Sequence, residues 1–159
     1  MERLTGCFAA AIFGKDRQNL VVGSCGHWDC TWRLHVMGHN GSIKGLMTHV
    51  VAHHKNIVTA IAMCPSPGSG TGESTSVYVV TGSKDTTGML WEVEVASKTP
   101  PEKPIHILFG HDDAVSAVAI DADLDMVASV SLDGTCIVHT LKSGVYTLTI
   151  RPPGLDDSR

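Results

Sequence analysis

The sequence has little positive charge. Its 159 residues contain 12 Lys and Arg against 16 Asp and Glu, which gives a formal net charge of −4. No cluster of Lys and Arg is long enough to follow a phosphate backbone, so nucleic acid is not an expected partner. Long apolar runs are missing as well: the apolar patch at residues 8–13 ends at Lys15, Asp16 and Arg17. We therefore expect neither a signal peptide nor direct membrane insertion.

A regular cysteine framework is also missing. The five cysteines are odd in number and irregularly spaced, which argues against the disulfide network of a secreted protein. This pattern favours a reducing compartment, and we predict a cytoplasmic location. Common catalytic signatures are absent too, because the sequence has no P-loop, no Gly-x-Ser-x-Gly elbow and no His-Glu-x-x-His metal helix. The sequence predicts a protein that is not an enzyme.

What the sequence does contain is an internal repeat. Hydrophobic residues make up 43% of the chain and charged residues 18%, which is typical of a globular protein. Residues 20–37, 77–93 and 126–141 align without gaps on an aspartate that is followed, six residues later, by a histidine or a tryptophan. The aligned pairs are Asp29 with His35, Asp85 with Trp91, and Asp133 with His139.

Each of these stretches has the pattern of a β-hairpin. Two alternating apolar strands surround a polar turn, and a shorter apolar strand lies on either side. The sequence therefore predicts an all-β fold of about three four-stranded antiparallel units. Gly, Ser and Pro-rich segments interrupt this pattern, and we expect them to be exposed loop insertions. The units cover about 6–50, 54–109 and 111–153 of one domain at 1–159, with insertions at 65–75 and 96–104.

A histidine precedes two of the units at a constant distance. His111 lies four residues before Val115, and His54 lies four residues before Val58. Together with the Ser-x-Asp of the hairpin turn and the aromatic residue that follows, this pattern resembles the hydrogen-bonded tetrad of WD-repeat β-propellers. A histidine can bridge an aspartate and a Ser or Thr hydroxyl, and an indole N–H can donate to the same hydroxyl.

The resemblance implies two tetrads, in each of which the sequence leaves the identity of the hydroxyl open. In the second unit the members would be His54, Asp85, Trp91 and either Thr81 or Ser83. In the third unit they would be His111, Asp133 and either Ser129 or Ser131, with His139 at the tryptophan position. The first unit has no Gly-His element before its opening strand, and we expect no tetrad there.

A narrower resemblance covers residues 6–153. The chain is similar to the C-terminal propeller of BEACH-domain, neurobeachin-like proteins, as an incomplete propeller of about three blades. This resemblance implies a non-catalytic protein-interaction scaffold in vesicle trafficking, endolysosomal sorting or autophagy, attached peripherally to membranes through other domains or partners. The similar segments are CGHWD at 25–29, GSKDTTGMLW at 82–91, LFGHDDAVSAVAI at 108–120, MVASVSLDGTCIVHTL at 126–141 and LTIRPP at 148–153.

Two other functions remain open. The chain could instead be a generic WD-repeat adaptor in a signalling or ubiquitin-ligase complex, and only neighbouring sequence separates that hypothesis from a trafficking scaffold. In either case the partners are proteins. Because three blades cannot close a ring, we also expect the rest of a propeller or another chain to cover the open blade faces.

A zinc module is the remote alternative. Cys25, His27, Cys30, His35 and His39 lie within fifteen residues, but their spacing matches no common zinc motif. Alternation along a strand would also turn them to different faces, so we expect no metal or other cofactor.

Two tryptophans of the first hairpin are candidate partner contacts. Trp28 lies in the turn and Trp32 lies just after it. For each of them, packing against the neighbouring blade is an equally good interpretation, and the sequence does not separate the two.

Overall fold

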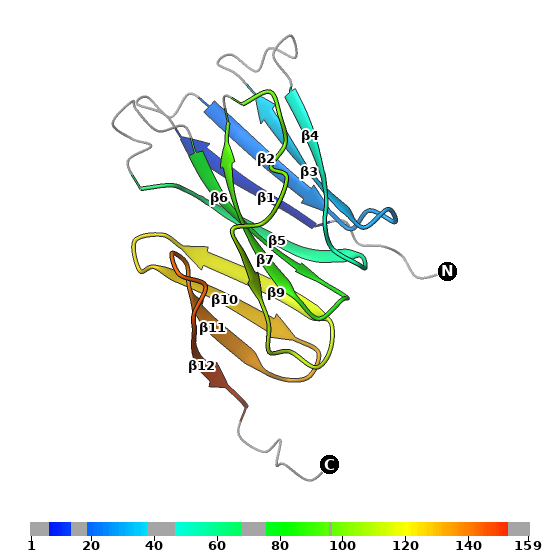
Figure 1. The fold of residues 1–159 in the computed structure, drawn as a ribbon, viewed down its shortest axis with the longest axis vertical. Helices are drawn as coiled ribbons and strands as arrows, with labels where there is room; N and C mark the ends of the chain where they lie inside the picture. Colours follow the sequence, from blue (N-terminus) through cyan, green and yellow to red (C-terminus); the bar gives the residue numbers. More distant parts are fainter. Residues whose placement is uncertain (1–6, 14–18, 38–46, 68–75, 96, 153–159) are drawn as a thin grey trace.

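The computed structural model describes residues 7–13, 19–37, 47–67, 76–95 and 97–152. These residues form strands, turns and loops, and none of them lies in a helix. The strands form three separate four-stranded antiparallel sheets, which follow one another along the long axis of the molecule (Figure 1). The sheets do not close into a ring. The prediction of an all-β, incomplete propeller with three four-stranded blades is confirmed.

Each blade is built from four consecutive strands. In the first blade these are β1 (Cys7–Phe13), β2 (Asn19–Cys25), β3 (Thr31–Met37) and β4 (Met47–Ala52). In the second they are β5 (Val58–Pro65), β6 (Ser76–Ser83), β7 (Gly88–Glu94) and β8 (His106–Leu108). In the third they are β9 (Val115–Asp121), β10 (Met126–Ser131), β11 (Cys136–Thr140) and β12 (Tyr146–Ile150). No helix that could cross a membrane occurs in the described ranges.

The two predicted insertions have different surroundings. At the first, Pro65 ends β5 and Ser66 is buried, while residues 68–75 lie outside the described part. At the second, residues 97–104 form no strand, and Thr99 and Pro100 are exposed. This second insertion is the loop that connects β7 to β8.

The three central hairpins share one local feature: the residue after the repeated aspartate has a left-handed backbone conformation. Its φ angle is 61° at Cys30, 72° at Thr86 and 81° at Gly134. Only glycine adopts this region without a steric cost, so Cys30 and Thr86 need compensating contacts. These come from the aspartate, whose carboxylate accepts a hydrogen bond from the threonine two residues later in each turn.

The gap-free alignment of the first hairpin is wrong by one residue. Trp91 pairs with Val79, twelve residues earlier, whereas the equivalent His35 pairs with Val22, thirteen residues earlier. One additional residue in the turn between β2 and β3 accounts for the difference. Since neighbouring strand residues point to opposite faces, Cys25 turns toward the second blade, while its aligned counterpart Thr81 turns toward the first.

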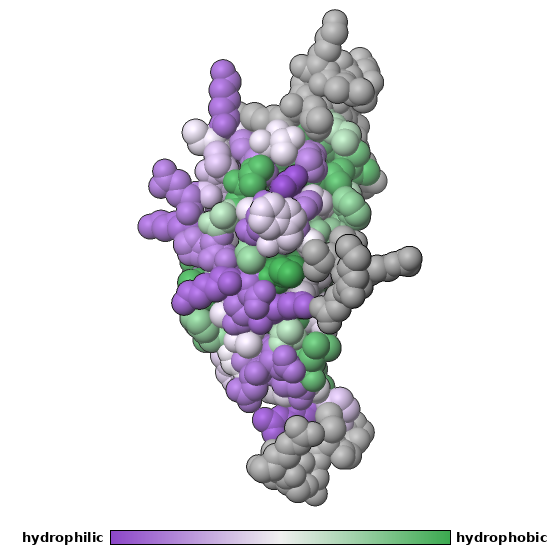
Figure 2. Space-filling model, turned by 90° about the vertical axis from the view of Figure 1, so that its right-hand side faces the viewer, coloured by the Kyte–Doolittle hydropathy of each residue, from purple (hydrophilic) through white to green (hydrophobic). Residues whose placement is uncertain are grey.

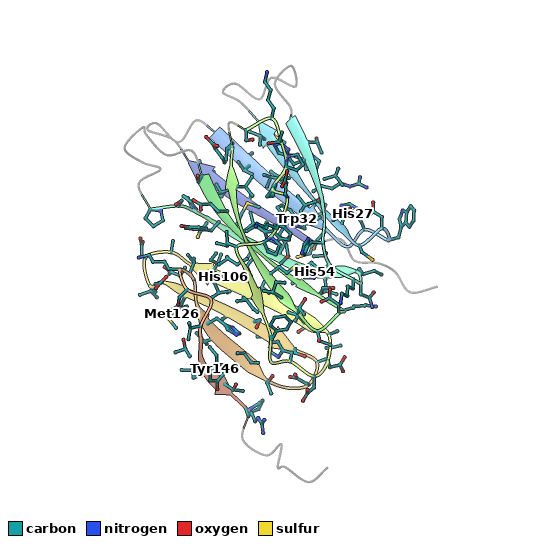
Figure 3. The ribbon with its side chains drawn as sticks, in the orientation of Figure 1. His27, Trp32, His54, His106, Met126 and Tyr146 are labelled. Atoms are coloured by element: carbon teal, nitrogen blue, oxygen red, sulfur yellow. The ribbon has the colours of Figure 1, made fainter. Side chains whose placement is uncertain are left out.

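The largest core lies between the first and second blades. Trp32 and Trp91 are both fully buried, and their ring centroids lie 5.5 Å apart. Figure 3 shows Trp32 between the ribbons of these two blades. Leu34 and Val21 pack into the same cluster from the first blade. Neither sheet can bury its apolar face alone, so this contact supplies the cover that both facing surfaces need.

A smaller core joins the second and third blades. Val80 and Leu90 of the second blade pack with Val127 of the third. A polar contact accompanies it, since the His106 ring lies 2.9 Å from the carbonyl oxygen of Lys142. Gly144, at φ 66°, lies directly under that ring, and a Cβ there would be 2.6 Å from it. Only glycine can occupy this position without displacing His106.

The two outer faces of the stack remain uncovered. Phe8 is 72% exposed and Ile12 56% exposed on the first blade, and Ile150 is 54% exposed on the third. In the side view of Figure 2, hydrophobic residues interrupt an otherwise hydrophilic surface. Three blades therefore leave apolar sheet surface in contact with solvent.

We predict that Trp32→Ala lowers the free energy of unfolding by about 3 to 5 kcal/mol, because it opens a cavity in the main inter-blade core. Trp28→Ala is the matched control, since Trp28 is 82% exposed, and its effect should stay within about 0.5 kcal/mol. Urea titration followed by circular dichroism measures both values. Equal losses of stability in the two variants would contradict the assigned core.

Candidate functional site

A continuous hydrogen-bond chain crosses the second blade from its hairpin turn to its core. His54 Nδ1 lies 2.9 Å from Asp85 Oδ2, and His54 Nε2 lies 2.9 Å from Thr81 Oγ1. Trp91 Nε1 donates to the same hydroxyl at 3.0 Å. One consistent set of roles runs from the indole N–H through the Thr81 hydroxyl and a neutral imidazole to the Asp85 carboxylate.

The electrostatics agree with a neutral His54. Burial lowers the pKa of His54 below its ordinary value, even though the Asp85 carboxylate acts in the opposite direction. Burial alone would raise the Asp85 pKa, but hydrogen bonds from Thr87 and from the Lys55 amide lower it. The pair is therefore a carboxylate beside an uncharged ring near neutral pH.

Asp85 also holds the turn itself. Its carboxylate accepts hydrogen bonds from the Thr87 hydroxyl at 2.6 Å, the Thr87 amide at 3.0 Å and the Lys55 amide at 2.8 Å. Thr87 was not among the residues predicted from the sequence. The Asp-x-Thr pattern that would have indicated it recurs at all three aligned aspartates: Asp29-Thr31, Asp85-Thr87 and Asp133-Thr135.

The hydroxyl that contacts the histidine is Thr81 rather than Ser83. Ser83 Oγ donates to the carbonyl of Ile57 at 3.0 Å and accepts the amide of Asp85 at 3.1 Å. It therefore fastens the turn to the loop before β5. Ser131 has the corresponding position in the third blade, where its hydroxyl donates to the backbone carbonyl of Asp113 at 2.9 Å.

The third blade has a related but shorter chain. His111 Nε2 lies 2.8 Å from Ser129 Oγ, and its Nδ1 lies 3.0 Å from Thr135 Oγ1 and 3.3 Å from Asp133 Oδ2. Although burial would raise it, the pKa of Asp133 is lowered to about 2 by hydrogen bonds from Thr135 and the Asp112 amide.

His139 occupies the tryptophan position of the third blade and interrupts the chain there. The residue is 4% exposed, and its Nδ1 is buried with no hydrogen-bond partner among the described residues. Its ring meets Tyr146 edge-on at 6.2 Å. Burial is the main cause that lowers the pKa of His139. A hydrogen bond with the Phe109 backbone raises this pKa by less, and the nearby His111 lowers it further.

In the first blade the turn is present, but the described residues contain no histidine bridge. Asp29 accepts from the Thr31 hydroxyl at 2.6 Å, and Arg33 lies 3.4 Å from its other oxygen. The Thr31 hydroxyl bond is the main cause of a lowered Asp29 pKa. Because of the additional turn residue, Ser24 faces the open side, where its hydroxyl lies 3.3 Å from His27 Nε2.

Those candidate zinc ligands that the structure describes do not point toward one common site. Cys25 is buried facing the second blade, and desolvation is the main cause that raises its pKa to about 12. His35 points to the opposite face and lies 3.1 Å from Thr48 Oγ1. Across the described ranges, no group of three or more His, Cys, Asp or Glu side chains could hold a metal ion. His39 lies outside those ranges.

The two candidate contact tryptophans have opposite environments. Trp28 is 82% exposed in the turn between β2 and β3. Trp32 has no exposed surface, because it packs against Trp91. Of the two interpretations that the sequence left open for Trp32, the structure favours packing against the neighbouring blade over a partner contact, because its side chain is buried between the blades.

We predict that Thr81→Val lowers the free energy of unfolding by about 1 to 3 kcal/mol, because it leaves Trp91 Nε1 and His54 Nε2 buried without a hydroxyl partner. The same substitution at exposed Thr99 is the matched control and should change stability by less than about 0.5 kcal/mol. Urea denaturation of both variants checks this. A Thr81→Val chain as stable as the parent would rule out a stabilising chain of hydrogen bonds.

We predict that His139→Trp stabilises the third blade by about 1 kcal/mol, because an indole N–H can donate to Ser129 as Trp91 does to Thr81. It should also reduce the sensitivity to acid. A folded-state pKa below the unfolded value means that protons favour unfolding as the pH falls below about 6.5. Melting curves at pH 7.5 and 5.5 measure both effects, and His35→Trp, on an open face, is the control. An unchanged difference between the two pH values would contradict this role.

Comparisons with known proteins agree with this architecture. Residues 2–157 match the family described as the neurobeachin beta propeller domain. BEACH domain-containing protein B of Arabidopsis thaliana is 33% identical over 165 residues, which cover 92% of this chain and 6% of that protein.

Two proteins of Dictyostelium discoideum are similar as well. BEACH domain-containing protein lvsD is 34% identical over 129 residues, covering 78% of this chain and 4% of that protein. BEACH domain-containing protein lvsE is 29% identical over 144 residues, covering 90% of this chain and 6% of that protein. The chain thus spans only about a twentieth of these relatives.

The family match extends over almost the whole chain and over all three blades. The described sheets have the strand order and the repeated turn expected of WD-like propeller blades. The chain belongs to the neurobeachin β-propeller family of BEACH-domain proteins.

Proposed function

We propose that this chain is a non-catalytic interaction scaffold of a BEACH-domain protein that acts in vesicle trafficking, endolysosomal sorting or autophagy. The observation that carries the scaffold role is Trp28, an indole 82% exposed on a firmly held turn. The Gly26 amide donates to the Val58 carbonyl at 2.9 Å, and Asp29 binds the hydroxyl and amide of Thr31. Exposed aromatic side chains on rigid supports are frequent hot spots of protein interfaces.

The histidine, aspartate and hydroxyl sets support a structural rather than a catalytic role. Both ring nitrogens of His54 and of His111 are engaged within their own blades. A general base needs a nitrogen that can reach a substrate, and a nucleophile needs an accessible hydroxyl. The hydroxyl of Thr81 is fully buried. We assign His54, Asp85, Thr81 and Trp91 to blade stability.

The five cysteines support a cytoplasmic location, with membrane association through other domains or partners. All five are free thiols. Their odd number and irregular spacing argue against the disulfide network of a secreted protein and favour a reducing compartment.

We further propose that the open faces of the first and third blades are covered by the rest of a propeller or by another chain. Phe8 and Ile12 are more than half exposed on one face, as is Ile150 on the other. Sheet faces with this character are covered at both inter-blade contacts that the structure describes. The same packing could continue at either end.

We predict that Trp28→Ala weakens the capture of a defined set of proteins by about 30-fold, as the loss of a 2 kcal/mol hot spot implies. The measurement is quantitative affinity capture with the parent chain, Trp28→Ala and the control Tyr146→Ala, which removes an aromatic residue that is 55% exposed on β12. Proteins of membrane trafficking should dominate the set lost with Trp28. Capture unaffected by Trp28→Ala would overturn the assigned contact, and a lost set of ubiquitin-ligase or signalling subunits would favour the generic adaptor.

A further inference from the structure

The chain contains two Ser/Thr-Pro dipeptides, and the structure separates them by accessibility. These are Ser66-Pro67 and Thr99-Pro100. Ser66 is only 8% exposed, and its amide donates to the Ser76 carbonyl at 3.0 Å, at the end of β5. Thr99 is exposed on the segment between β7 and β8. The sequence gives the two sites equal standing, but only Thr99 can enter the active site of another protein.

The segment around Thr99 forms no strand, and its backbone bonds to the sheet lie at its two ends. Among the described residues, its backbone bonds run from the Ser97 amide to Glu94 and from the Ile105 amide to Leu90. Pro100, Pro101 and Pro104 have no N–H to donate, so the segment cannot pair as a strand. Thr99 therefore lies on an exposed loop outside the sheet, where another protein can reach its side chain.

Two carboxylates near Thr99 would repel a negative charge placed on its side chain. Thr99 shares a surface hollow with Ser97 and with Glu92 and Glu94 of β7. The hydroxyls of Ser97 and Thr99 lie 3.0 Å apart, and the Thr99 amide donates to Ser97 Oγ at 3.2 Å. A phosphate brings about −1.5 to −2 charges at neutral pH, which two neighbouring carboxylates repel. Lys98 offsets part of this repulsion from the solvent side, since it is exposed on the same segment.

The segment also lies beside an unpaired part of β7. In Figure 1 the chain between β7 and β8 runs as a loop past the β7 arrow. β8 pairs with β7 only from Gly88 to Leu90, and in the described part of the chain no strand pairs with the stretch from Trp91 to Glu94 on that edge. Displacement of residues 97–101 would therefore expose a strand edge, a surface on which other chains can pair.

We propose that Thr99 is a phosphorylation site for a proline-directed serine/threonine kinase, and that its phosphate displaces residues 97–101 from β7. In the reaction, Thr99 Oγ1 attacks the γ-phosphorus of ATP, the bond from that phosphorus to the β–γ bridging oxygen breaks, and ADP leaves. The hydroxyl proton passes to the base of the kinase. This inference is independent of the proposed trafficking role.

The test treats the folded 159-residue chain with a proline-directed kinase and ATP and locates the phosphate by mass spectrometry. Peptides around Ser66 and Thr99 establish that the kinase accepts both sequences when no fold protects them. In the folded chain we expect more than tenfold faster modification at Thr99 than at Ser66. Pro100→Ala should abolish it, and Ser66→Ala should leave it unchanged. Equal rates at both sites, or no modification of Thr99, would overturn the proposal.

Hydrogen exchange tests the displacement separately. Amides of residues 91–95 should exchange faster in the phosphorylated chain than in the unmodified chain, whereas those of β10 should not change. The variant Glu92→Gln with Glu94→Gln removes the two repelling carboxylates and should suppress the difference. Phosphorylation of Thr99 without any change in exchange at residues 91–95 would show that the loop stays in place.

Discussion

The packing of one blade face on the next is the constraint on which this structure depends. A four-stranded sheet of short strands cannot bury enough apolar surface alone, so each blade needs a neighbour. The contact between Trp32 and Trp91 meets this need for the first two blades, and Val80 and Leu90 with Val127 meet it for the next pair. The same requirement explains why apolar side chains remain exposed at both ends of the stack.

Directional hydrogen bonds give each blade one register, which apolar packing alone does not specify. The repeated aspartate is followed by a left-handed turn residue, and its carboxylate accepts a hydrogen bond from the threonine two positions later. In the second and third blades it also reaches the histidine of the preceding loop, which is tied to a hydroxyl on the central strand. Buried polar groups of this kind cost stability when unpaired, so other registers are disfavoured.

The surface is free to vary because the repeated residues face inward. Trp28 and Thr99 both lie on connections between strands, outside the cores and the hydrogen-bond chains. Changes at such positions leave the blades intact, while a rigid sheet holds the connections in place. The family resemblance of the chain therefore resides mainly in its interior, whereas any specificity for partners or modifying enzymes resides in its loops.

The sequence by itself determined the all-β class, the three units and the pairing of His54 with Asp85 and of His111 with Asp133. These follow from local alternation and from spacing that repeats along the chain. Tertiary structure decided the rest. The additional residue in the first turn reverses the face of Cys25, and Trp32 is buried while Trp28 is exposed. His54 contacts Thr81 rather than Ser83, because the Ser83 hydroxyl is bound to the loop before β5. Each outcome depends on contacts between segments far apart in sequence, which a local pattern does not encode.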